Sequence, residues 1–260
     1  MSLSNPEFRT ERFSSPGRCI YCDRRDLLLS REHIIPAGIK GHMVLPAASC
    51  ESCSKLTSQA EMHVLRDWWG VLRGTNGIYS ARRKDSRKST VTALVQGNDA
   101  TEIVDIPFEA MPAIYPVLRM PPPGIVRGIS SPTSPEMQLD LCTVQPDFKV
   151  RMVALDATSV QMQADLAPGR LWAMLAKIAH GYTVAVLGLD SFLPLVRRLC
   201  LGEEERPWDY VGGEWIEFES RTNYLHFVEL RQDGDLLLCR VQLFSAFHSA
   251  PYVVAVGRAK

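Results

Sequence analysis

The chain of 260 residues lacks a long uninterrupted hydrophobic run, an excess of charge of either sign, and an internal repeat. Its first residues contain no apolar stretch of the kind that a secretory signal needs. The most apolar segment, 171–195, is interrupted by Lys177, His180 and Asp190, which favours core helices over a membrane span. We therefore expect a cytoplasmic protein without a membrane partner, in which His180 is a core histidine.

Cysteine is scarce, and the odd number of seven argues against a framework of disulfides. Four cysteines form two Cys-x-x-Cys pairs, Cys19 with Cys22 and Cys50 with Cys53. The other three lie singly in apolar surroundings, at positions 142, 200 and 239. In a reducing compartment this distribution predicts one metal site and three buried thiols.

The two pairs predict a structural zinc site. Zinc prefers four thiolate or imidazole ligands in a tetrahedron, and two short Cys-x-x-Cys turns supply four sulfurs. The alternatives are two unrelated groups of buried thiols, or a redox dithiol, which would need a surrounding βαβ pattern that the sequence does not have.

Charge is unevenly distributed, although the formal net charge is zero. Residues 1–90 hold fifteen Lys and Arg against nine Asp and Glu, a net of +6, whereas residues 91–260 have a net of −6. Positive charge therefore gathers around the cysteine motif, where it would favour a polyanionic partner. Chance variation of the surface would give the same pattern.

Composition and periodicity predict four segments. These are a flexible arm over 1–17, a cysteine-motif domain over 18–80, a basic linker over 81–89 and a larger α+β domain over 90–260. The first domain should contain a helix over 55–73, in which Glu61 shares an apolar face with Trp68 and Leu72 and His63 points outward.

The larger domain should mix strands and helices. We expect helices over 168–186 and 190–201, strands over 91–95, 102–106, 148–153 and 252–257, and a hairpin of 224–230 with 236–243. The role of this domain is not evident from its sequence.

Between the cysteine pairs lies the element Ser30-Arg-Glu-His-Ile-Ile-Pro36. Phosphodiester hydrolysis needs an activated water and a counter-charge for the phosphorane. The imidazole of His33 can accept a proton from water near neutral pH, and the carboxylate of Glu32 can hold a divalent metal. In a regular strand the two side chains point to opposite sides, so sharing one phosphate requires a bend.

Taken together, residues 18–73 resemble the HNH endonuclease superfamily, and more closely bacterial HNH proteins of the zinc-knuckle subtype. The resemblance rests on Cys-x-x-Cys, then Leu-Ser-Arg-Glu-His-Ile-Ile-Pro, then Val44-Leu-Pro-Ala-Ala-Ser-Cys-x-x-Cys. It implies an N-terminal ββα-metal, treble-clef-like domain stapled by structural zinc. It also implies a separate catalytic divalent ion, Mg²⁺ or another metal.

Carried over by position, the resemblance makes His33 the general base, Glu32 a metal ligand, and Cys19, Cys22, Cys50 and Cys53 the zinc ligands. Two parts of the common pattern are replaced. Leu45 stands near the position of an Asn that orients the base, and Ser54 and Thr57 stand where Asn or His is common.

Glu61 is the preferred further ligand of the catalytic ion, because a carboxylate on an inward helix face must be paired, hydrogen-bonded or metal-bound. A salt bridge to an arginine such as Arg31 would satisfy it equally well. His63 and His42 are weaker candidates, the first for the metal and the second for phosphate.

Three functions are compatible with these features. The first is a metal-dependent DNA endonuclease, with phosphate contacts from Arg18, Arg24, Arg25, Arg31, Arg66 and Arg73. The second is a zinc-dependent nucleic-acid-binding or regulatory protein whose nuclease centre has weakened. The third is a protein-interaction adaptor that acts through its acidic C-terminal domain.

Overall fold

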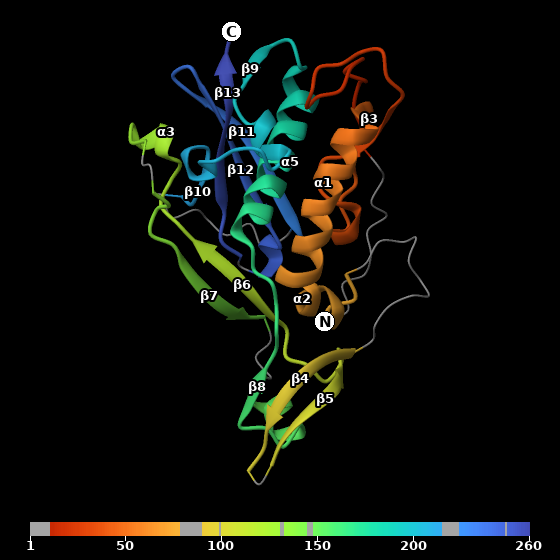
Figure 1. Ribbon diagram of the computed structural model, residues 1–260, viewed down its shortest axis with the longest axis vertical. Coiled ribbons are helices and arrows are strands. Elements are labelled where there is room, and N and C mark those ends of the chain that lie inside the picture. The colour runs from red at the N-terminus through yellow and green to blue at the C-terminus, as the bar shows by residue number, and fades with distance from the viewer. Residues whose placement is uncertain are drawn as a thin grey trace.

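The computed structural model describes residues 11–78, 90–98, 100–130, 133–144, 148–214, 224–247 and 249–260. Most of the predicted N-terminal arm and the predicted basic linker 81–89 lie outside these described residues. The fold is a mixture of helices and antiparallel strands, arranged as an upper body and a smaller projection (Figure 1). No helix among the described residues has the length and apolarity needed to cross a membrane.

The cysteine motif folds as a hairpin followed by a helix. Strand β2 (Leu29–His33) pairs antiparallel with β3 (Met43–Cys50), and a short helix, η1 (Ala37–Ile39), connects them. The two-residue strand β1 (Glu11–Arg12) adds to β3 in parallel. Helix α1 (Glu51–His63) starts directly after β3, so the hairpin and the helix form one compact unit.

The predicted helix over 55–73 is present but begins earlier. After α1 the helix continues through the π-helical turn η2 (Val64–Trp68) and then α2 (Gly70–Thr75). Trp68 and Trp69 are buried, as the apolar face predicts, and the chain leaves the helix near Gly77, which has a positive φ of 60°.

A long helix, α5 (Pro168–Leu187), lies against the central sheet on one side and α1 on the other (Figure 1). Thirteen of its twenty residues are buried, because neighbours cover it on several faces. The main hydrophobic core is continuous from Cys19 to Val256 and includes α5. This packing brings polar side chains of α5 against the hairpin of the cysteine motif.

The central sheet confirms the predicted C-terminal hairpin and the final strand. Its order is β10-β13-β12-β11, and all pairs are antiparallel. Strand β9 pairs antiparallel with the end of β13, from Gly257 to Ala259. The strands are β9 (Phe192–Pro194), β10 (Val211–Gly212), β11 (His226–Asp233), β12 (Leu236–Leu243) and β13 (Tyr252–Ala259).

The projection is built from β4 (Thr90–Gln96), β5 (Thr101–Pro107) and β8 (Ser159–Gln161), with α4 (Phe148–Ala154) nearby. It has a small core of its own around Ala93, Ile106 and Met111. A ribbon of β6 (Ile114–Arg119) and β7 (Gln138–Thr143) runs between the projection and the body. Short helices complete the fold: α3 (Gly124–Arg127), α6 (Arg197–Cys200), η3 (Pro207–Asp209) and η4 (Ser245–Phe247).

Two predicted elements of the larger domain were wrong. Residues 148–153 form helix α4 instead of a strand, because six alternating residues are too few to separate a period of 2 from one of 3.6. Residues 190–201 form a turn, the strand β9 and the short helix α6 instead of one helix, because β9 pairs with β13.

Candidate metal centre and carboxylate cluster

The four predicted zinc ligands converge. Cys19 and Cys22 lie in the turn before β2, Cys50 ends β3, and Cys53 lies in the first turn of α1. Their four sulfur atoms lie within 4.8 Å of one another, and the Sγ atoms of Cys22 and Cys50 are 3.7 Å apart. Zn–S bonds of about 2.3 Å in a tetrahedron require sulfurs about 3.8 Å apart. The group of four cysteines could therefore hold a zinc ion.

The surroundings of the sulfurs shift the pKa values of the cysteines in different directions. Burial raises the pKa of the Cys53 thiol well above its usual value. At Cys50 burial acts in the same direction, but hydrogen bonds from Ser52 and the backbone of Cys53 prevail and lower the pKa to about 6. Four thiolates this close repel one another, so a bound Zn²⁺ would supply the charge that lets all four ionise.

Glu32 and Glu61 also come together, but a lysine lies between them. Glu32 is buried on β2 and Glu61 approaches from α1. The Nζ atom of Lys177, on α5, lies 2.8 Å from Oε1 of Glu32 and 2.6 Å from Oε1 of Glu61. The Lys177 side chain is 1 % exposed. Glu61 is thus paired, as its inward position predicts, but with Lys177 instead of an arginine such as Arg31.

Backbone oxygens complete the surroundings of this ammonium. Lys177 donates to the carbonyl oxygen of His33 and lies 3.3 Å from that of Ile34. Two carboxylates and two carbonyls are the oxygen ligands that a hard divalent cation prefers. In this fold those oxygens surround the Lys177 ammonium.

The electrostatics of the cluster favour a charged lysine. Burial acts to lower the pKa of Lys177, but the charges of Glu32 and Glu61 outweigh it and raise the pKa above its usual value. The pKa of Glu61 is raised because burial and the nearby Glu32 outweigh the opposing effect of Lys177.

A divalent ion at Glu32 and Glu61 does not fit beside this ammonium, because both would need the same oxygens. Among the described residues, the four cysteines are the one group of His, Cys, Asp or Glu side chains placed to hold a metal. The predicted Mg²⁺ site therefore has no support in this geometry.

The predicted base, His33, is half-buried at the end of β2. The ladder is regular here, with Glu32 opposite Leu45 and His33 opposite Val44. Adjacent residues of a paired strand direct their side chains to opposite faces. The hairpin has an irregularity, but it lies between Ser30 and Glu32, before the Glu-His pair. The bend that a shared phosphate requires is thus not between these two residues.

The other residues of the motif have structural surroundings. Leu45 is fully buried in the core, and Thr57 is buried and donates to the carbonyl oxygen of Cys53. His63 is not the outward residue that the helical pattern predicts. Its side chain is 14 % exposed, and Nδ1 lies 3.6 Å from Oδ2 of Asp67. His42 is half-buried in the loop before β3.

Four of the six arginines proposed to contact phosphate have partners within the chain. Arg18 is buried beside Asp190 and lies 2.6 Å from Oδ1 of Asp23. Arg73 donates to backbone carbonyls, 3.0 Å from that of Gly38.

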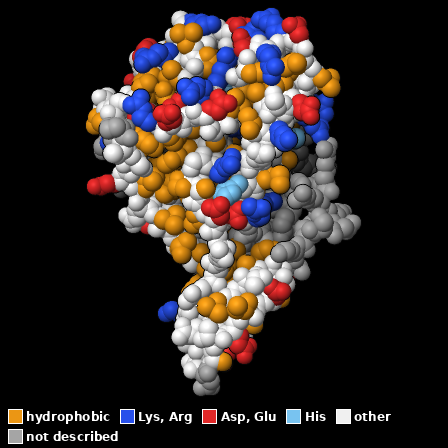
Figure 2. Space-filling model, viewed as in Figure 1, with side chains coloured by type: hydrophobic (Ala, Val, Ile, Leu, Met, Phe, Trp, Pro, Cys, Tyr) orange, Lys and Arg blue, Asp and Glu red, His pale blue; other side chains and the backbone are white. Residues whose placement is uncertain are grey.

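The third of these arginines, Arg66, is 2.8 Å from Oδ2 of Asp67. The fourth, Arg24, is exposed but lies 3.3 Å from Oγ of Ser52. The remaining two arginines, Arg25 and Arg31, are exposed close to the cysteine motif in sequence. Figure 2 shows Lys and Arg side chains, interspersed with acidic ones, over the upper body that carries this motif.

Lys177 was not among the predicted site residues, although the sequence contains a signal for it. A lysine within an otherwise apolar helix must find a buried partner. His180, one turn later, is fully buried, as predicted, and its Nε2 lies 2.8 Å from the carbonyl oxygen of Ile20. His226 of β11 makes a similar contact, 2.6 Å, with the carbonyl oxygen of Ile39. These contacts join the larger region to the cysteine motif.

Comparison with known proteins gave no match to a protein family, a curated protein or a solved structure.

Proposed function

We propose that this chain is a zinc-dependent nucleic-acid-binding protein in which Lys177 takes the place of the catalytic cation of an HNH centre. The observation that carries this proposal is the position of the Lys177 ammonium, within 2.8 Å of both Glu32 and Glu61. The lysine fills the position between the carboxylates, so the hairpin and helix serve as a stable scaffold instead of a hydrolytic site.

The nucleic-acid partner is proposed from charge. The first 90 residues have a net charge of +6, and Arg24, Arg25 and Arg31 are exposed near the zinc ligands. Guanidinium groups on a rigid zinc-bound turn are suited to phosphate contacts, which hold a duplex without reading its sequence.

A metal-dependent DNA endonuclease is the second candidate. The convergence of Glu32 from β2 and Glu61 from α1 favours it, because both carboxylates were expected at the catalytic ion. This function would require Lys177 to leave the position that it occupies.

Binding of a fluorescent DNA duplex by zinc-loaded protein tests the first proposal. We expect affinity that falls steeply with added salt, and a log–log slope that decreases by about 1 for each phosphate contact removed in Arg25→Ala or Arg31→Ala. Arg258→Ala is the matched control, because Arg258 lies on β13 of the C-terminal sheet and pairs with Asp235. Absence of salt-dependent binding would exclude the nucleic-acid partner.

Nicking of supercoiled plasmid with Mg²⁺, Mn²⁺ or Ni²⁺ separates the two candidates. The first predicts no cleavage by the wild-type protein. Cleavage that disappears in His33→Ala, at unchanged zinc content, would establish the endonuclease.

A further inference from the structure

Strand β11 forms an open edge of the central sheet. It pairs with β12 from His226 opposite Leu243 to Asp233 opposite Leu236. On its other side no strand lies among the described residues. An eight-residue edge leaves backbone N–H and C=O groups available for a further strand.

The hairpin determines which residues face that edge. β11 and β12 are joined by the two-residue turn Gly234-Asp235, in which Gly234 has a φ of 60°. In such a hairpin the closing pair, Asp233 with Leu236, exchanges both hydrogen bonds, and bonded pairs then alternate along the ladder. Asp233, Arg231 and Glu229 therefore bond to β12. Leu230, which lies between two of these residues, directs its N–H and C=O away from β12, toward the open edge.

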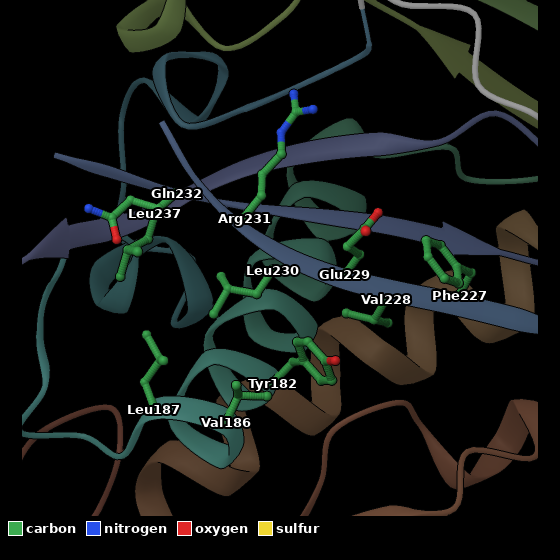
Figure 3. A pocket seen from close by; sticks show the side chains of 10 residues that line it. All are labelled: Tyr182, Val186, Leu187, Phe227, Val228, Glu229, Leu230, Arg231, Gln232 and Leu237. Atoms are coloured by element: carbon green, nitrogen blue, oxygen red, sulfur yellow. The ribbon is translucent and has the colours of Figure 1, made fainter. Parts of the chain in front are cut away.

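A groove of about 440 Å³ follows the same edge (Figure 3). Its floor is apolar, with Val186 and Leu187 of α5 50 % and 38 % exposed. Figure 3 shows Leu230 directed toward α5, and Glu229 and Arg231 projecting to the other face of the strand.

We propose that the occupant of this edge is a second copy of the chain, paired antiparallel through β11 with a two-fold axis at Leu230. Charge and the length of the overlap select this register. It places Glu229 opposite Arg231 of the second copy, and Arg231 opposite Glu229 of the second copy, so two ion pairs form by symmetry. An axis at Val228, the next residue with outward backbone groups, would instead place Glu229 opposite Phe227. An axis at Gln232 would also oppose unlike charges, Arg231 and Asp233, but it would pair only residues 231–233 of the two strands.

Glu229 and Arg231 can pair across the interface, because the charged side chain opposite Glu229 already has another partner. Arg240 lies opposite Glu229 on β12, but its Nε is 3.1 Å from Oε2 of the buried Glu214. Arg231 is exposed and lies opposite the apolar Leu238. The apolar floor of the groove lies on the other face of β11, where Leu230 of the two copies would meet.

Sedimentation of the full-length, zinc-loaded protein over a concentration series tests this dimer. We expect a reversible monomer–dimer equilibrium in the wild type. Glu229→Arg alone and Arg231→Glu alone each place like charges opposite one another and should weaken dimerisation by roughly tenfold or more. The double variant Glu229→Arg/Arg231→Glu restores opposite charges and should restore the dimer.

Circular dichroism and urea unfolding of the same variants separate loss of the interface from loss of the fold. A wild-type protein that stays monomeric at every concentration would overturn the proposal. So would single variants that dimerise as well as the wild type, or a folded double variant that remains monomeric. Leu230→Pro, which removes the outward N–H at the axis, should also abolish the dimer.

Discussion

Lys177 reaches Glu32 and Glu61 from a helix whose other buried residues are almost all apolar or small. A buried ammonium is stable only when carboxylates and carbonyls replace the water that it has lost. The same holds for the two carboxylates, which need the ammonium between them. The three groups are therefore interdependent, and the loss of one leaves the others unpaired.

Substitution of Lys177 by Met should destabilise the protein by about 3–5 kcal/mol, because two buried carboxylates would then face one another without a cation. Replacing Glu32 and Glu61 by Gln in the same chain should recover most of that loss. Urea unfolding measures both effects. A Lys177→Met variant within about 1 kcal/mol of wild type would contradict a buried ion cluster.

At the residue scale, the sequence was sufficient to predict the clustering of the four cysteines and the inward position of Glu61. The spacing of two Cys-x-x-Cys turns predicts that their four sulfurs come together, and the helical period places Glu61 on the buried face. Its partner could not be read in the same way, since Lys177 is 116 positions further along the chain. Local periodicity carries no information about which distant charge will meet a buried carboxylate.

At the scale of elements, the contact between β11 and η1 depends on a neutral histidine, His226. His226 of β11 accepts from the backbone N–H of Phe244 at Nδ1, 3.2 Å away, and donates from Nε2 to the carbonyl oxygen of Ile39 in η1. A second ring proton would meet the Phe244 N–H. Burial is the main cause that lowers the pKa of His226 to about 4.

This contact should make the fold sensitive to acid. The folded pKa lies below the unfolded value of about 6.5, so the unfolded chain binds more protons and stability falls as the pH decreases from about 6.5 to about 4. The loss from His226 should reach about 2 kcal/mol at pH 5. In His226→Gln the decrease should be smaller by that amount, as urea unfolding at several pH values would show. Equal slopes for wild type and variant would exclude this role.

Other elements show where the hydrophobic pattern of the sequence cannot decide between helix and strand. The hairpin of β11 and β12 was predicted because turn residues separate two long apolar runs. The segment 148–153 alternates equally well but is helical, and β9 replaces a predicted helix because β13 has an edge to pair. Short segments follow their tertiary neighbours more than their own propensity.

At the scale of the whole molecule, the cysteine motif and the C-terminal sheet share one hydrophobic core. This core includes Cys19 and Cys53 together with Leu175 of α5 and Val254 of β13. The cysteine motif is thus packed as part of the body. A perturbation of the four clustered cysteines should consequently reach the entire body of the molecule.

Removal of zinc by a chelator, or the substitution Cys53→Ser, should lower the melting temperature by roughly 10 °C or more. Calorimetry should record this as a shift of the main transition, because the body unfolds together. Cys142→Ser is the matched control, since Cys142 is half-buried on β7 and is not among the four clustered cysteines. A separate early transition for the cysteine motif alone would show that the two regions unfold independently.

The central claim is that Lys177 occupies the position between Glu32 and Glu61 that a catalytic metal would need. Mn²⁺ binding to the zinc-loaded protein, followed by electron paramagnetic resonance, tests this claim most directly. The position of Lys177 predicts no tight Mn²⁺ site in the wild type and a new one in Lys177→Ala, where two carboxylates and two carbonyls remain. One tight Mn²⁺ per wild-type chain, lost in Glu32→Gln, would contradict this assignment and favour the endonuclease.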